Sequence, residues 1–563
     1  MDNGSLQLRS RVLGPLPVLN HFLARLRIED ILAGRLPRGG NHVSHEQCLG
    51  VLLRNIVLGR APVYGLGEWA EPFLPSVLGL DQSQAERLND DRVGRALDHL
   101  FDADRASMQT EMVVTAIREF ELELEQFHND STSLTFTGQY RDADGDNKRG
   151  KSSLRIARGH NKDHRPDLKQ LLWILTVTAD GAVPVHYRAC DGNTTDSPTH
   201  QESWEAIRAL VGRPDFLYVA DCKLCTDGNI KHIDSKHGRF ITVLPRNRKE
   251  DEWFRRHIQS HEVPWEEVCR QPDPRVMGGT PDVYRMVESP MPSAEGFRIV
   301  WVWSSKKAEK DLAARQGLME RAVIGVEQVE TRLRNPRNRL YERADVVEAV
   351  EKAIGLRAGR WIGYEIHDEE DASYRQERPG RPGKDTRYRR EVRVRYHVEW
   401  YPKGEHIEFD GASDGMFPLI TNCTELSHKD ILAKYKYQPY LEKRHEQLKN
   451  VYGVAPVFLK NVTRIEALLF LYFTAILVQA LIERQVRRGM EERGIESLPV
   501  YPEERECEAP TTARLLTMFD NLQIHDLWDG GTMVQTFLPE LSEMQKELLE
   551  LMEVPAEVYT KVV

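Results

Sequence analysis

The chain has 563 residues, of which 40% are hydrophobic and 29% charged, and its formal net charge is −10. This composition is typical of globular proteins and excludes a disordered or fibrous chain, while the length allows three to five domains at roughly 100–200 residues each. Taken as a whole, the negative charge argues against a protein that coats itself in nucleic acid.

The sequence predicts a cytoplasmic protein with no membrane partner. Its longest apolar run, residues 467–478, is shorter than the roughly 20 residues that a membrane-spanning helix needs. The first residues lack the apolar core of a secretion signal. The seven cysteines are scattered along the chain and do not form the spacing of a disulfide framework.

Residues 1–125 are predicted to be helical, because their apolar residues recur at helical spacing. Ser44 and Gln47 have the spacing of a capping box, which begins a helix whose apolar face follows directly. The pattern then changes to alternating and apolar runs that predict strands. These runs are residues 131–138, 171–178, 184–189, 216–220 and 239–244, with a helix at 199–210. The order predicts an α/β fold with a mixed sheet whose first three strands form a meander.

Residues 245–405 interrupt this pattern with a strand at 298–303, a long charged helical stretch at 308–352 and a Pro/Gly/Arg-rich segment followed by alternation. A second α/β portion resumes near Ile407 and leads into a helix that begins at Pro439. The apolar run at 465–482 predicts a core helix. The remaining residues are predicted to be helical, and they are acidic.

Three acidic residues occupy positions where catalytic groups collect in α/β proteins. Asp130 lies beside the first predicted strand, and Asp221 directly follows the strand FLYVA, at its carboxyl end. Pro439 suits the first position of a helix, so Glu442 lies in its first turns and Lys449 two turns later on the same face. Each residue also has a plain explanation, because aspartate favours turns and caps and a Glu/Lys ladder suits a solvated helix face.

Together these residues resemble the motifs of one branch of bacterial insertion-sequence DDE transposases. That branch carries the signature Y-x2-R-x3-E-x6-K, and Tyr435, Gln438, Glu442 and Lys449 repeat its spacing with Gln438 in place of the arginine. The phrases NDSTSLTFTG and YVADCKL are similar to its two aspartate motifs. LGPLPVLNHFLARLRIEDIL resembles the helical leader of one group within it, so the resemblance covers most of the chain.

The resemblance implies an RNase H-like catalytic sheet that is interrupted by a β-rich insertion. The expected organisation is a helical, DNA-binding leader at 1–125, the first catalytic half at 126–244, the insertion at 245–405, the second catalytic half at 406–485 and an acidic helical region at 486–563.

The resemblance also implies that Asp130, Asp221 and Glu442 are catalytic and hold two Mg²⁺ or Mn²⁺ ions, with Asp130 bridging both. Cutting and rejoining DNA is an in-line displacement at phosphorus, in which two divalent ions stabilise the attacking and leaving oxygens. Mg²⁺ prefers carboxylate, water and phosphate oxygens. The implied function is metal-dependent cleavage at transposon ends and strand transfer. The expected partners are double-stranded terminal inverted repeats and target DNA, bound by a homodimer in the bacterial cytoplasm at the nucleoid.

Further residues are expected to contact DNA. Tyr435, Gln438 and Lys449 would contact the transposon end, as the resemblance implies, although a glutamine cannot offer the bidentate charged contact of an arginine. Two basic segments, residues 148–169 and 375–395, each carry a net charge of +6. Such segments bind phosphates and position DNA without reading its sequence. Their candidate contacts are Lys162, Arg165, Arg387, Arg389 and Arg390.

Two other interpretations stay open: a catalytically inactive, transposase-derived DNA-binding protein, and an RNase H-like nuclease with another nucleic-acid substrate. Cys222 and Cys225 form a single CxxC pair, which is too little for a zinc site. Asp196 is explained by turn chemistry, although it could assist the metal ligands.

Overall fold

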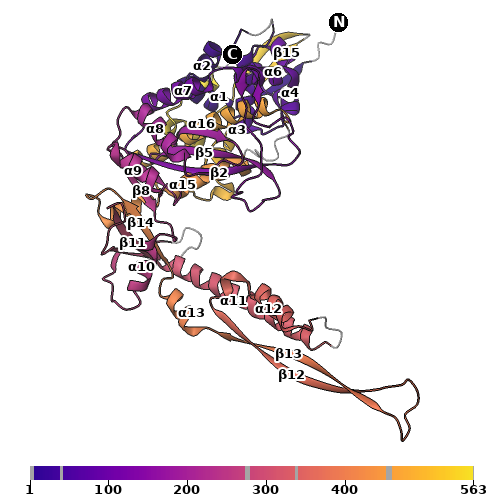
Figure 1. Ribbon diagram of the computed structural model, residues 1–563. Coiled ribbons are helices and arrows are strands. Elements are labelled where there is room, and N and C mark those ends of the chain that lie inside the picture. The colour runs from indigo at the N-terminus through magenta and orange to yellow at the C-terminus, as the bar shows by residue number, and fades with distance from the viewer. Residues whose placement is uncertain are drawn as a thin grey trace. The chain divides into compact units, whose positions relative to one another are not determined.

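The computed structural model describes residues 6–38, 42–272, 279–335, 340–451, 459–529 and 531–561. The chain forms two compact units. Unit 1 comprises Met1–Thr242 and Leu432–Val563, and unit 2 comprises Val243–Ile431. Figure 1 labels the elements of both.

The N-terminal part of unit 1 is mainly helical, as predicted. Its α-helices are α1 (Leu16–Arg25), α2 (Ile28–Arg35), α3 (His45–Leu58), α4 (Leu66–Ala70), α5 (Gln82–Ala85), α6 (Asp90–Asp102) and α7 (Arg105–Glu119). The predicted capping box is confirmed at the start of α3. The Ser44 hydroxyl accepts a hydrogen bond from the Gln47 backbone N–H, and the Gln47 side chain accepts one from the Ser44 backbone N–H.

Unit 1 contains a five-stranded mixed sheet in the order β6-β5-β2-β7-β8. The strands are β2 (Gln126–Phe136), β5 (Lys169–Thr178), β6 (Pro184–Cys190), β7 (Leu217–Ala220) and β8 (Arg239–Val243). The first three form the predicted antiparallel meander, whereas β7 runs parallel to β2 and β8 parallel to β7. Helix α8 (Thr199–Val211) precedes β7, and α9 (Asp227–Ser235) connects β7 to β8. Two short strands, β3 (Asn147–Lys148) and β4 (Lys151–Ser152), lie in the β2–β5 connection.

Strand β2 begins earlier than the predicted residues 131–138 and therefore contains Asp130, which the prediction placed just before the strand. Its first half is polar yet mostly buried, which is unusual for a central strand. Hydrogen bonds compensate this burial: the Asn129 amide, for example, donates to the Thr176 hydroxyl on β5 at 2.8 Å.

Helix α16 (Val462–Arg493) is the core helix of unit 1, as predicted for residues 465–482. It packs against α3, α6 and β6. By length and composition α16 could cross a membrane, but its most apolar window is entirely buried inside the protein. Burial of this kind is typical of a core helix. Helices α14 (His428–Tyr435) and α15 (Gln438–Glu446) precede it, and α15 continues into a π-helical turn, η3 (Gln447–Val451).

The prediction of wholly helical ends is wrong, because the two ends of the chain build a three-stranded sheet. Strand β1 (Gln7–Val12) pairs with β15 (Gln523–Asp529), which pairs with β16 (Thr532–Phe537). Strand β1 obtains its hydrogen bonds from β15, more than 500 residues away in the sequence, so local periodicity does not reveal this pairing. Helices α17 (Thr512–Thr517) and α18 (Glu543–Leu551) complete this region.

Unit 2 contains a four-stranded antiparallel sheet in the order β14-β11-β10-β9. The strands are β9 (Glu266–Gln271), β10 (Asp282–Glu288), β11 (Arg298–Ser304) and β14 (Met416–Thr421), and the flanking helices are α10 (Lys249–His257) and α13 (Gly404–Gly411). The predicted insertion ended at residue 405, whereas this unit extends to Ile431 because β14 pairs with β11.

The predicted single helix at 308–352 consists of two helices, α11 (Ser305–Leu333) and α12 (Arg343–Ala358). Helix α11 ends just before the Asn-Pro dipeptide at 335–336, and proline disfavours helical geometry in the residue before it. A long two-stranded ribbon follows, formed by β12 (Ile362–Gln376) and β13 (Tyr388–Pro402). Its base packs on α11 and α12 through an apolar cluster that includes Ile366 and Val398. The ribbon continues past these two helices (Figure 1).

Candidate active site

Asp130 and Asp221 lie side by side at one edge of the unit 1 sheet. In the parallel pairing of β2 with β7, Asn129 stands opposite Ala220, so the two aspartates are the next residues on adjacent strands. The Asp221 carboxylate accepts a hydrogen bond from the Lys223 backbone N–H at 3.0 Å. Its backbone carbonyl accepts one from the Thr242 hydroxyl at 2.6 Å, so the strand end is held on both sides.

The surroundings of Asp130 and Asp221 raise the pKa of both carboxyl groups. Burial raises the pKa of Asp130 above its usual value, and the Asp196 carboxylate adds to the rise while Lys162 opposes it. Burial also raises the pKa of Asp221, and the neighbouring charge of Asp130 raises it further. Desolvation and a like charge both disfavour the ionised form. A bound cation would relieve both effects.

Glu442 approaches this pair from α15. Partial desolvation and then the charge of Asp130 raise the pKa of Glu442, although its side chain remains exposed to solvent. Asp130, Asp221 and Glu442 therefore come from a central strand, the end of its parallel neighbour and a helix. The structure brings together the three carboxylates that the sequence singled out.

Arg444 holds α15 in place. Its guanidinium donates hydrogen bonds to the carbonyls of Gly181 and Ala182, at 3.0 and 3.1 Å, in the turn between β5 and β6. It also pairs with Glu483 of α16 at 2.8 Å, and both side chains are buried. Because Arg444 lies only two residues after Glu442, this anchor fixes the glutamate relative to the sheet.

Gln438, for which the sequence predicts a DNA contact, packs inside unit 1. The side chain is buried. Its oxygen lies 2.8 Å from His128 Nδ1, and its amide nitrogen donates to the Asn129 carbonyl at 3.3 Å. A neutral amide can both donate and accept, so it suits this buried contact better than an arginine would. Gln438 thus joins α15 to the strand that carries Asp130.

Lys162, a predicted DNA contact, lies among the carboxylates instead. Its ammonium is 3.5 Å from Asp130 Oδ1 and 3.2 Å from Asp196 Oδ2. It also donates hydrogen bonds to the carbonyl and hydroxyl oxygens of Ser131, at 2.6 and 2.7 Å. Burial lowers the pKa of Lys162, but the negative charges of three neighbouring carboxylates raise it more strongly, so the net shift is upward. These carboxylates are Asp130, Asp196 and Asp221. The lysine is therefore a charged counter-ion of this site.

Asp196 lies beside the cluster, 3.2 Å from the Lys162 ammonium, which agrees with the alternative to the turn explanation that the sequence left open. It lies six residues after β6 and shortly before α8. Its backbone carbonyl accepts a hydrogen bond from the Thr199 hydroxyl at the start of that helix. His445 was missed: it is buried, with Nε2 3.7 Å from Asp130 Oδ2. Burial, together with Lys162 and Lys449, lowers the pKa of His445 to about 3. Its spacing of three residues from Glu442 was the available signal, because such residues share a helix face.

Tyr435 and Lys449 lie close to the carboxylates. Burial and then the charge of Asp221 raise the pKa of Tyr435 to about 12, so its hydroxyl stays protonated. Lys449 pairs with Asp163 at 2.6 Å. It stands in the π-helical turn η3 and not in a continuous α-helix, so the predicted face it shares with Glu442 is not that of an ideal helix.

The remaining predicted DNA contacts lie outside this cluster. Arg165 pairs with the exposed Asp167 at 2.7 Å. Arg389 and Arg390 are on β13 of unit 2, and Arg387 immediately precedes that strand.

The donor set is suited to a hard divalent cation, since all three central groups are carboxylates. The Lys162 ammonium shows that this environment attracts positive charge. In the described part of the chain, however, no group of three or more His, Cys, Asp or Glu side chains is spaced to hold a metal ion as it stands. Metal binding would thus require the carboxylates to close around the ion and Lys162 to move aside.

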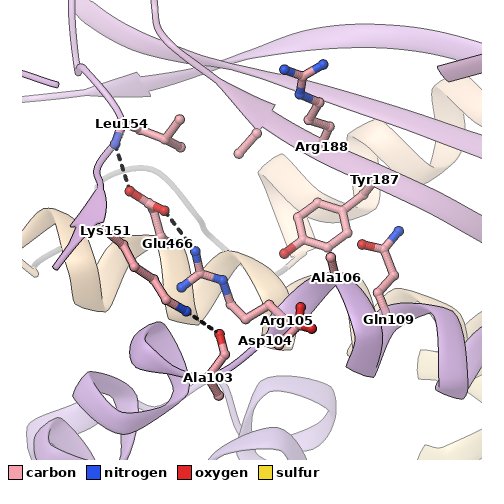
Figure 2. Close-up of a pocket in the computed structure, with 11 residues that line it drawn as sticks. Ala103, Asp104, Arg105, Ala106, Gln109, Lys151, Leu154, Tyr187, Arg188 and Glu466 are labelled. Carbon is pink, nitrogen blue, oxygen red and sulfur yellow. Dashed lines mark hydrogen bonds and ion pairs between the residues drawn. The ribbon is translucent and has the colours of Figure 1, made fainter. Parts of the chain in front are cut away.

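The pocket in Figure 2 shares no residue with the carboxylate cluster. Glu466 of α16 lines this pocket and accepts hydrogen bonds from the Leu154 backbone N–H at 2.7 Å and from Arg105 at 3.0 Å. Lys151 donates to the Ala103 carbonyl at 2.8 Å. These contacts attach the first basic segment to the helices, so the pocket wall is a structural ion-pair network.

A family model described as a domain of unknown function (DUF4277) matches residues 8–114, the helical leader. No curated protein matches the chain in sequence. Among solved structures, the chain is similar to a piggyBac transposase in a synaptic complex with hairpin DNA. That match has 9% identity and a TM-score of 0.37, and it covers 88% of this chain and 79% of the other.

Proposed function

We propose that the protein is a DDE transposase that cleaves DNA at transposon ends and transfers the freed strands into target DNA. One observation carries the proposal: Asp130 and Asp221 occupy neighbouring positions on β2 and at the end of β7, and α15, which carries Glu442, brings His445 Nε2 within 3.7 Å of Asp130 Oδ2. The strand order β6-β5-β2-β7-β8, with three antiparallel strands followed by two parallel ones, supports an RNase H-like catalytic sheet. The spacing of Tyr435, Glu442 and Lys449 supports the insertion-sequence branch.

Asp130, Asp221 and Glu442 would hold two Mg²⁺ or Mn²⁺ ions, which would supply charge stabilisation for in-line displacement at phosphorus. Within the protein, Arg444 and Gln438 hold the glutamate helix against β2. Lys162 neutralises the cluster until a cation replaces it. Tyr435, with its protonated hydroxyl, can donate a hydrogen bond to a phosphate oxygen, and Lys449 can do so once it leaves Asp163.

The proposed partners are double-stranded transposon ends and target DNA, bound by a homodimer in the bacterial cytoplasm at the nucleoid. Arg165 and the arginines of the unit 2 ribbon would provide phosphate contacts. The helical leader, residues 1–125, and the insertion would share the binding of the ends.

The test combines the purified full chain, Mg²⁺ and a duplex that carries the inverted repeats flanking the gene. We expect cleavage that EDTA abolishes. Asp130→Asn, Asp221→Asn and Glu442→Gln should each lower the rate about 10³-fold, which corresponds to several kcal/mol of lost stabilisation. Glu446→Gln is the matched control, because Glu446 is an exposed glutamate one turn further along α15.

Binding of the duplex without cleavage under all metal conditions would contradict the proposal and favour an inactive, transposase-derived DNA-binding protein. Cleavage that survives one of the three carboxylate substitutions would remove that residue from the site. Cleavage of unrelated duplexes or RNA at the same rate would indicate a general nuclease.

A further inference from the structure

The two faces of the unit 2 ribbon differ in chemistry. In an antiparallel pair, directly opposed residues project from the same face and successive residues alternate between faces. Tyr374 stands opposite Arg390, and Gln376 opposite Tyr388, whereas Arg375 stands opposite Arg389. One face, called here the aromatic face, is formed by Ala372, Tyr374, Gln376, Tyr388, Arg390, Val392 and Val394. The other, called here the basic face, carries Arg375, Arg389 and Arg393, with Asp371, Ser373 and Glu391 beside them.

The aromatic face is open to solvent. Tyr374 and Tyr388 are 68% and 49% exposed, and Val392 and Val394 are 44% and 46% exposed. Large apolar side chains that line one face of an isolated ribbon and remain exposed indicate a binding surface. Arg390, on the same face, lies 4.0 Å from Glu370, and its side chain is still 57% exposed.

The charge of the ribbon end indicates which partner it binds. Residues 374–390 contain seven basic and two acidic residues. Arg375 and Arg389 oppose each other directly, and like charges in that position destabilise a strand pair. A polyanion placed against the ribbon would remove this repulsion, whereas a second copy of the ribbon would increase it. Positive charge with exposed aromatic and amide side chains is complementary to nucleic acid.

We propose that the ribbon end enters the major groove of double-stranded DNA, with the aromatic face toward the base edges and Arg375 and Arg389 reaching phosphates. This inference rests on the proposed function, from which it takes DNA as the partner. The major groove, about 12 Å wide, admits a two-stranded ribbon. The aromatic face carries the side-chain types that read bases there: arginine for guanine, glutamine for adenine, and an apolar group for the thymine methyl. The ribbon would thus recognise sequence as well as bind phosphates.

Two neighbouring arginines are expected to contribute differently to DNA binding. Arg389 and Arg390 follow one another on β13 but project from opposite faces. Arg389→Ala should weaken binding to every duplex alike and lower the salt dependence by about one phosphate contact, a slope of roughly 0.9. Arg390→Ala and Gln376→Ala should instead lower the affinity for preferred duplexes roughly 5- to 100-fold and change the affinity for others little.

The experiment uses the full chain in EDTA, which prevents cleavage, and a pool of duplexes with a randomised central region. Bound duplexes are sequenced, and enriched and unenriched duplexes are then titrated individually over a range of salt concentrations. We expect Arg390→Ala and Gln376→Ala to lose the base preference at one or two positions. We expect Arg389→Ala to retain the whole preference at lower affinity. Circular dichroism of each variant checks that the fold is retained.

Equal losses on all duplexes for Arg389→Ala and Arg390→Ala would overturn the inference while leaving DNA binding and the proposed function intact. Unchanged binding in both variants would also overturn it. The ribbon contacts a membrane instead if the parent protein cleaves its end duplex and the ribbon variants bind duplexes as the parent does but bind anionic vesicles less well than the parent. If the parent binds no duplex at all, the proposed function fails as well.

Discussion

The two basic segments carry the same net charge in the sequence but use it differently in the structure. In the first, residues 148–169, most cations already have partners inside unit 1. These contacts are Arg149 to Asp102, Lys151 to the Ala103 carbonyl, Arg155 to the Asp144 carbonyl, Lys162 to Asp130 and Asp196, and Arg165 to Asp167. In the second, residues 375–395, the arginines project from an exposed ribbon.

The difference shows that the net charge of a segment does not measure the positive surface that it offers to a partner. The cations of the first segment contact the carboxylate cluster and acidic residues of neighbouring helices, so their charge stabilises the fold. The second segment lies on a ribbon whose described end does not pack on an apolar core, so its positive charge remains available to a binding partner. We therefore expect substitutions in the first segment, apart from Arg165, to affect folding and metal binding, and substitutions in the second to affect DNA binding.

The largest expected effect comes from neutralising the second segment. Arg387→Ala, Arg389→Ala and Arg390→Ala combined should weaken binding to all DNA on the order of 10²-fold at low salt. They should lower the salt slope by about 1.8, at roughly 0.9 for each of the two phosphate contacts, Arg387 and Arg389. Fluorescence anisotropy with a labelled duplex at several salt concentrations measures both quantities.

The matched control for this variant replaces Arg149, Arg155 and Lys169 of the first segment by alanine. These residues hold protein groups, so the control should lower the melting temperature but leave the salt slope nearly unchanged. An equal fall in the salt slope in both triple variants would break the comparison, and an unchanged slope in the ribbon variant would contradict the DNA contacts.

The next effect concerns Lys162. Lys162→Ala leaves Asp130 and Asp196 without their counter-ion and should lower the free energy of unfolding in EDTA by about 2 kcal/mol, less than for a fully buried pair because the lysine is partly exposed. A divalent cation can replace the lost ammonium, so Mn²⁺ should raise the melting temperature of the variant more than that of the parent. Thermal unfolding with and without Mn²⁺ measures this.

Arg158→Ala serves as the control for Lys162→Ala, because Arg158 is an exposed cation of the same segment. Its melting temperature should equal that of the parent in both conditions. If Mn²⁺ stabilised Lys162→Ala less than the parent, the lysine would be assisting metal binding, and its role as a replaceable counter-ion would be wrong.

The smallest effect is expected at Glu466, which attaches the first segment to the helices (Figure 2). Glu466→Ala leaves the Leu154 N–H and the Arg105 guanidinium without this acceptor and should lower the free energy of unfolding by about 1 kcal/mol. Urea unfolding measures the change. Glu492→Ala, at the exposed end of the same helix, should have almost none, and an equal loss in both variants would show that Glu466 is no special anchor.

Much of the site could be predicted from the sequence because its signals are local. Asp221 follows an apolar run that can only be a buried strand, and Pro439 sets the start of the helix that carries Glu442. The meander of β2, β5 and β6 follows from apolar runs and one tight turn. In contrast, the polar first half of β2 concealed the strand, because its hydrogen bonds are made with Gln438 and Thr176 from distant parts of the chain.

The sequence by itself determined the mixed sheet and the core helix, since periodicity and turn chemistry act over a few residues, and it singled out the three carboxylates as candidates. Only the tertiary structure decided which charges are available. Lys162 and Arg390 look alike in the sequence, but one neutralises buried aspartates and the other stands exposed on a ribbon. The physical reason is that the energy of a charge depends on the burial and the neighbouring charges that folding assembles around it, and these come from elsewhere in the chain.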